Sequence, residues 1–132
     1  MDSEAAPILD QEDPLTRAVI GAGIEVHRAL GPGLLESAYE SCLGIELQAR
    51  GIAHQAQVEL PVVYRGHTVG CTYRLDLVIE NRLIVELKAV ERVLPIHKAQ
   101  VLTYLRLSGK RTGLLMNFNV PCLKDGIERF SL

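Results

Sequence analysis

Several features that mark specialised classes of protein are absent from this 132-residue chain. It has only three cysteines, Cys42, Cys71 and Cys122, and no two of them form a CxxC pair. Such a sparse, odd-numbered set argues against a disulfide scaffold and a zinc site, so we expect free, buried thiols in a reducing cytoplasm. No apolar run approaches the roughly 18–20 residues of a membrane-spanning helix, and the acidic start lacks a signal peptide's basic region.

A surplus of basic residues is also absent. The chain has 14 Lys and Arg against 16 Asp and Glu, a net charge of −2, which taken alone argues against a nucleic-acid partner. Residues 1–13, however, hold five of the acids and no base, which leaves 14 bases against 11 acids, or +3, for the rest. We predict an acidic tail over residues 1–13 and a mildly basic single domain over 14–132. This body is compatible with a phosphate-bearing partner, although an ordinary solvated terminus gives the same pattern.

The spacing of apolar residues predicts an α/β fold. Helical periodicity begins at the Asp13-Pro14 cap and runs to Leu30, and it returns after a Gly-Pro-Gly break. The predicted helices are 14–30, 34–50 and 97–108, and the predicted strands are 57–64, 67–79, 83–88, 112–118 and a short 127–130. No repeat or linker divides the chain. A hairpin meander that leads into a crossover helix predicts a mixed sheet flanked by helices.

Three charged residues lie within strands that are otherwise apolar. Asp76 lies between two leucines, and Glu86 and Lys88 share one face of the next strand. A tight turn makes these strands antiparallel neighbours, so the charges meet in a central part of the sheet, where unpaired charges are costly. Two interpretations stay open. One is an ion pair on a half-exposed sheet face; the other is a Mg²⁺ site formed by both carboxylates and the Leu87 carbonyl.

Three further residues extend this set. Glu36 begins the second helix, where it is either a charge that complements the helix dipole or an additional acid of the site. Gln100 and Tyr104 are four residues apart and share one face of the third helix. They are either ordinary surface residues or groups that hold a water molecule and a phosphate near Lys88.

At these positions the sequence resembles the GxxExxY protein family, which is placed in the PD-(D/E)XK nuclease superfamily. The signature is Gly33-Leu34-Leu35-Glu36-Ser37-Ala38-Tyr39, preceded by a fitting segment, Val26–Gly33. The other matching segments, in order, are Tyr73–Asp76, Val85–Glu91, His97–Gln100 with Tyr104-Leu105, and Gly113–Phe118. The resemblance covers about residues 14–130, and the ordered set of motifs is far more specific than any one of them.

The resemblance implies a restriction-endonuclease-like three-layer core of αβββαβ order and hydrolysis of nucleic-acid phosphodiester bonds, with DNA favoured over RNA. It implies that Asp76, Glu86, the Leu87 carbonyl and Glu36 bind Mg²⁺ or Mn²⁺, and that Lys88 is the catalytic lysine. Gln100 and Tyr104 resemble a QxxxY motif of RecB-like exonucleases. Basic residues that are candidates for phosphate contacts are Arg74, Arg92, Lys98, Arg106, Lys110 and Arg111.

A second hypothesis is a catalytically silent module that keeps the nuclease fold and binds a nucleic acid or a protein. The chain shows no added region that would select a substrate, so a homo-oligomer or a protein partner is also compatible with it. No membrane association is expected.

Overall fold

The structure, a computed structural model, describes residues 13–132, so all of the predicted acidic tail except Asp13 lies outside the described residues. Its elements are α2 (Pro14–Leu30), α3 (Glu36–Ala49), β1 (His54–Tyr64), β2 (His67–Ile79), β3 (Leu83–Lys88), α4 (Pro95–Ser108), β4 (Thr112–Asn117), η1 (Leu123–Gly126) and β5 (Ile127–Ser131). The predicted bounds of β2 and β3 are confirmed. Helix α3 begins two residues later than predicted, at Glu36, and β1 begins three residues earlier, at His54.

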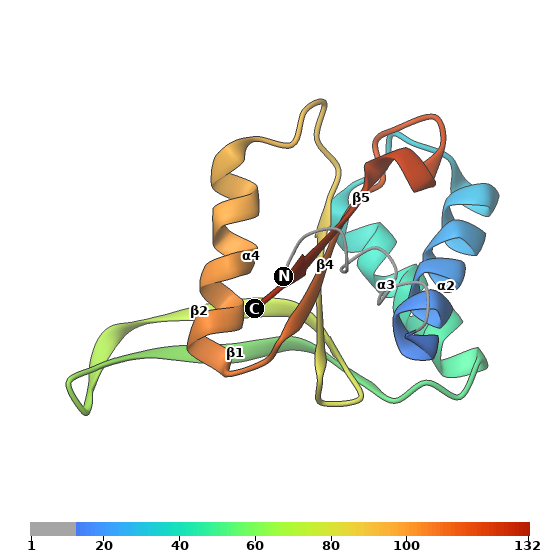
Figure 1. The fold of residues 1–132 in the computed structure, drawn as a ribbon. Coiled ribbons are helices and arrows are strands. Elements are labelled where there is room, and N and C mark those ends of the chain that lie inside the picture. Colours follow the sequence, from blue (N-terminus) through green and yellow to red (C-terminus); the bar gives the residue numbers. More distant parts are fainter. Residues whose placement is uncertain (1–12) are drawn as a thin grey trace.

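The five strands form one mixed sheet in the order β1-β2-β3-β4-β5. Only β3 and β4 are parallel, and α4 connects them; the other neighbouring pairs are antiparallel. Figure 1 shows α4 on one face of the sheet and α2 with α3 on the other. The predicted three-layer arrangement of a mixed sheet between helices is therefore confirmed.

Two apolar clusters hold the layers together, one on each face of the sheet. Alternation along β3 decides which residue enters which cluster: Val85 and Leu87 face α2 and α3, whereas Ile84 faces α4. On the first face the largest fully buried side chain is Tyr39 of α3, whose ring stacks on Phe118 with centroids 4.5 Å apart. Burial on both faces is typical of a central strand next to a parallel partner, and it places β3 in the middle of the molecule.

Strand β2 is much longer than its pairing with β3. Only Leu77, Val78 and Ile79 pair with β3, while β1 follows β2 as far as Tyr64, which pairs with His67. In the part of β2 that precedes Leu77, β1 and β2 therefore form a two-stranded hairpin, which extends away from the rest of the sheet in Figure 1. On this edge strand the register shifts between Pro61 and Val63, since proline lacks the N–H that a regular ladder needs.

The expectation of buried thiols is wrong for Cys122, which is exposed, and Cys42 is only half-buried. Cys122 lies in the bend before η1, where the chain leaves the sheet, so it has no layer above it. Both of these cysteines are free, as predicted. Within residues 13–132 no helix has the length and apolar character needed to cross a membrane.

Candidate active site

Asp76 and Glu86 meet where β2 and β3 separate. The last paired residues are Leu77 and Val85, so the next pair along the strands is Asp76 and Glu86. Here side chains replace the backbone ladder: the Asp76 N–H donates to Glu86 Oε2 at 2.9 Å, and the Leu87 N–H donates to Asp76 Oδ2 at 2.9 Å. The two carboxylates are therefore held side by side by backbone groups, as the predicted alternation required.

The environment of Glu86 opposes its negative charge. Glu86 is only 6 % exposed, and burial together with the neighbouring Asp76 carboxylate raises its pKa to about 8. The hydrogen bond from the Asp76 N–H and the charge of Lys88 act in the opposite direction without cancelling this rise. A group of opposite charge bound at the pair would favour the ionised form.

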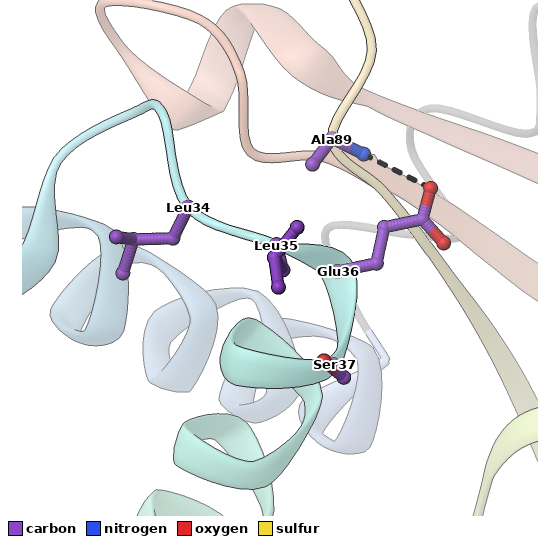
Figure 2. Close-up of a pocket in the computed structure, with 5 residues that line it drawn as sticks. All are labelled: Leu34, Leu35, Glu36, Ser37 and Ala89. Carbon is purple, nitrogen blue, oxygen red and sulfur yellow. Dashed lines mark hydrogen bonds between the residues drawn. The ribbon is translucent and has the colours of Figure 1, made fainter.

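Glu36 lies near the end of β3, beside Ala89. Its Oε2 accepts a hydrogen bond of 3.3 Å from the N–H of Ala89, the residue after Lys88. Figure 2 shows this bond at the edge of a pocket of about 380 Å³, which is lined by Leu34, Leu35, Glu36, Ser37 and Ala89. The N-terminus of α3 is thereby joined to the end of β3, which brings Glu36 close to the site without placing it in the carboxylate pair.

The final tyrosine of the Gly33–Tyr39 signature holds the loop before Glu36. Tyr39 is fully buried, its hydroxyl donates to the Gly31 carbonyl at 2.5 Å, and the Leu34 N–H donates to the same hydroxyl at 3.1 Å. Gly31 has a φ of 71°, which glycine adopts at little cost. The signature thus combines an acid with the tyrosine that shapes the loop leading to it.

One acid of this region is missing from the predicted set. Glu40, one turn after Glu36 on α3, accepts a hydrogen bond of 2.9 Å from the Gln57 side chain. Burial, and then the charges of Asp76 and Glu36, raise the pKa of Glu40 against the lowering effect of Gln57. Gln57 lies opposite Asp76 in the β1–β2 register and has a φ of 55°. The i, i+4 spacing from Glu36 was the available sequence signal for Glu40.

Helix α4 brings Tyr104 toward the carboxylates but leaves Gln100 in solvent. Tyr104 is 8 % exposed, and burial, then the charges of Glu86 and Asp76 and the nearby Tyr73, raise the pKa of its hydroxyl. The Tyr73 and Tyr104 rings lie 5.9 Å apart at 49°. Gln100 is exposed. Tyr104 is therefore close enough to the carboxylate pair to be affected by its charges.

A second residue that sequence reasoning did not single out, Asn117, holds the chain just after Lys88. It is 3 % exposed; its side-chain oxygen accepts from the Val90 N–H at 3.0 Å, and its amide donates to the Val90 carbonyl at 2.9 Å. The Phe118 N–H also donates to the Lys88 carbonyl at 2.8 Å. These bonds continue the β3–β4 ladder into the loop and so fix the backbone that carries Lys88.

Comparison with known protein families identifies the superfamily of this chain. Residues 13–130 match the family model described as the PD-(D/E)XK nuclease superfamily. The chain belongs to this superfamily. No curated protein and no solved structure matches it significantly.

PD-(D/E)XK nucleases generally use Mg²⁺ or Mn²⁺, so the donor groups must be compared with such an ion. Asp76, Glu86 and the Leu87 carbonyl supply oxygen, the ligand type that these hard cations prefer, and the pKa of Glu86 is raised by burial and then by the neighbouring Asp76 charge. Among the described residues, no three His, Cys, Asp or Glu side chains group closely enough to hold a metal ion. The donors therefore fit an ion that keeps several of its waters, with Glu36 and Glu40 outside direct contact.

Three of the six predicted phosphate-binding residues have other partners. Arg74 pairs with Glu59 at 3.9 Å, Lys98 pairs with Glu128 at 3.0 Å, and Arg106 donates to the Thr103 hydroxyl at 3.2 Å. Arg92 is exposed in the loop after β3, Arg111 is exposed and Lys110 is half-buried.

Proposed function

We propose that this chain hydrolyses phosphodiester bonds of nucleic acid, DNA in preference to RNA, with Asp76, Glu86 and Lys88 as its central residues. The observation that carries this proposal is the pair of reciprocal 2.9 Å bonds that hold two carboxylates where β2 leaves β3. Membership of a nuclease superfamily supports the same reaction class. The similarity of Gly33–Tyr39 to the GxxExxY signature is part of this proposal.

Each residue has a role that follows from its position. Asp76, Glu86 and the Leu87 carbonyl would bind Mg²⁺ or Mn²⁺, with Glu36 acting through water. When bound, such an ion lowers the pKa of a water ligand and neutralises charge on a phosphate. Lys88 follows Leu87 on β3, and its positive charge would orient the attacking water and attract the phosphate. The Tyr104 hydroxyl would donate a hydrogen bond at the same place, and Gln100 would reach the substrate from solvent.

A catalytically silent module is the second candidate. Two observations favour it: no third acid joins the carboxylate pair within residues 13–132, and three of the six candidate bases are engaged with other side chains. In this alternative the chain binds nucleic acid or a protein without cutting. A homo-oligomer or a protein partner would then supply the missing groups. Either function is compatible with the proposed cytoplasmic location.

The decisive experiment compares cleavage of end-labelled single- and double-stranded DNA and RNA with Mg²⁺, Mn²⁺ or EDTA. The informative variants are the nearly isosteric Asp76→Asn and Glu86→Gln, together with Lys88→Met. Glu25→Gln, on the exposed surface of α2, is the matched control for loss of one acid. We expect metal-dependent cleavage that falls at least 100-fold in the three site variants and is unchanged in the control. Equal cleavage by wild type and Glu86→Gln contradicts the proposal, and binding without any cleavage supports the silent module.

A further inference from the structure

An aromatic side chain lies on the same strand as Asp76 without belonging to the core. Tyr73 is on β2, three residues before Asp76, and it is 43 % exposed. It pairs with Leu60 of β1, in the part of β2 that has no β3 neighbour. The apolar cluster beneath α4 includes Leu60, Leu75 and Tyr104 but not Tyr73. Packing of the fold alone therefore gives no reason for an aromatic residue at this position.

The partner of Tyr73 fixes its place. The ring of Tyr104 lies 5.9 Å away, tilted by 49°, and Tyr104 itself is almost completely buried. A buried ring that contacts an exposed one restrains it at little further cost, because aromatic side chains have few rotatable bonds. The exposed Tyr73 ring is thus held next to Tyr104. The pKa of the Tyr104 hydroxyl is raised by burial and then by the charges of Glu86 and Asp76.

The charges around the site point to the same kind of contact. Arg74 and Lys98 form ion pairs with Glu59 and Glu128, so an acid already lies beside each of these bases and opposes the approach of a phosphate. Because three of the six candidate bases are already engaged with other side chains, a further source of affinity for nucleic acid would strengthen binding. Stacking of bases on aromatic rings is such a source, and it is open to bases that have left the double helix.

We propose that Tyr73, supported by Tyr104, stacks on an unpaired base next to the phosphodiester bond at the carboxylate pair, so that single-stranded nucleic acid is the preferred substrate class. This inference rests on the proposed function and specifies its substrate. It also gives Tyr73 a direct contact with the substrate. Duplexes would be bound only where an end or a mismatch frees a base.

The test measures binding without cleavage, in EDTA. The probe is a short oligodeoxythymidine with one 2-aminopurine, whose fluorescence reports stacking, and anisotropy gives the affinity. Tyr73→Leu removes the ring, whereas Tyr73→Phe keeps it. Tyr64→Leu is the matched control, because Tyr64 is an aromatic residue of the same hairpin with 65 % exposure. Thermal unfolding of each variant establishes that it is folded.

We expect Tyr73→Leu to weaken binding of the single strand about tenfold and to abolish the fluorescence change. Tyr73→Phe and Tyr64→Leu are expected to stay within twofold of wild type, and duplex affinity is expected to change little. Three results overturn the inference: unchanged binding by Tyr73→Leu, equal losses in Tyr73→Leu and Tyr64→Leu, or equal losses for single strand and duplex.

Failure of the inference and failure of the proposed function give different results. If wild type cleaves nucleic acid with metal while Tyr73→Leu keeps its affinity and fluorescence response, only the stacking inference is wrong. If wild type binds no nucleic acid in EDTA or with metal, both are wrong. Cleavage that prefers intact duplexes over single strands contradicts the inference and leaves the hydrolytic function in place.

Discussion

The Tyr39 hydroxyl bridges the two ends of the loop between α2 and α3, donating to the Gly31 carbonyl and accepting from the Leu34 N–H. The same ring stacks on Phe118, the residue that follows β4. A single side chain therefore ties the loop before Glu36 to the centre of the sheet. Glu36 in turn bonds to Ala89, so the position of the pocket in Figure 2 depends on Tyr39.

We predict that Tyr39→Phe lowers the free energy of unfolding by about 1–2 kcal/mol, because two backbone groups lose their partner while the ring stays in place. Tyr39→Leu also removes the stack on Phe118 and is expected to cost about 3 kcal/mol or more. Urea unfolding measures both. Tyr64→Phe, which removes an exposed hydroxyl, is the control and should change nothing. A Tyr39→Phe protein as stable as wild type contradicts the proposed bridge.

Asn117→Ala is predicted to destabilise the protein by about 2–4 kcal/mol, because the Val90 N–H and carbonyl both lose their partner. Hydrogen exchange is the more specific measurement: the Val90 amide should exchange faster, while amides in the middle of β3 keep their relative protection. Asn119→Ala is the matched control two residues away. Unchanged exchange at Val90 would show that another group fixes the loop after Lys88.

The pH dependence of stability follows from Glu86. Its folded-state pKa of about 8 lies above the ordinary value of 4.5, so the folded protein keeps a proton that the unfolded chain releases. In the metal-free protein this stabilisation is complete below pH 4.5 and is lost as the pH rises to about 8, by up to about 5 kcal/mol.

Glu86→Gln stays neutral at every pH and should remove most of this slope, so that in EDTA it is more stable than wild type at pH 8. Denaturant unfolding from pH 5 to pH 9 measures the difference. Parallel curves for wild type and Glu86→Gln would show that Glu86 does not keep its proton in the folded protein.

Addition of a divalent cation should offset the loss of stability that ionisation of Glu86 causes. We predict that Mg²⁺ or Mn²⁺ at about ten times its Kd raises the Tm of wild type by roughly 3–6 °C at pH 8, because a ligand of the folded state stabilises it. Asp76→Asn and Glu86→Gln should lose this increase, and Glu25→Gln should keep it. An equal increase in all four proteins would place the bound ion elsewhere.

Gly126→Ala is predicted to cost about 2–4 kcal/mol. A Cβ at this position would overlap the Asn117 carbonyl oxygen, a backbone atom that cannot rotate away. Gly70→Ala is the matched control, because a Cβ there meets nothing within 4 Å and φ is not left-handed. It should be neutral or slightly stabilising. Thermal unfolding of the two variants checks the contrast.

The sequence was sufficient for the parts of the site that depend on local geometry. Alternation along β3 and a tight turn between the strands predict that Asp76 faces Glu86 or Lys88, and both features are visible in a short segment. The structure confirms the strands and this neighbour relationship. The helix that begins at Asp13-Pro14 was predictable for the same reason, and Asp13 accepts from the Leu15 N–H at 3.1 Å.

Contacts between distant segments were not predictable. Glu36 reaches Ala89, Gln57 reaches Glu40 and Asn117 reaches Val90, each across different elements of the fold. Which of these side chains meet depends on the packing of helices on the sheet, and a periodic pattern does not contain that information. The predicted metal role of Glu36 and the predicted phosphate roles of the bases remain hypotheses for the same reason.

The separation of β2 from β3 at Asp76 also has a consequence for folding. Asp76 and Glu86 are ten residues apart and are joined by a short hairpin, so bringing them together closes only a small loop. Tyr104 and Asn117 come into place only after the α4 crossover has formed and β4 has paired with β3. Non-local parallel pairing is a slow step in folding. We therefore expect the two acids to become neighbours early, before the rest of the site assembles around them.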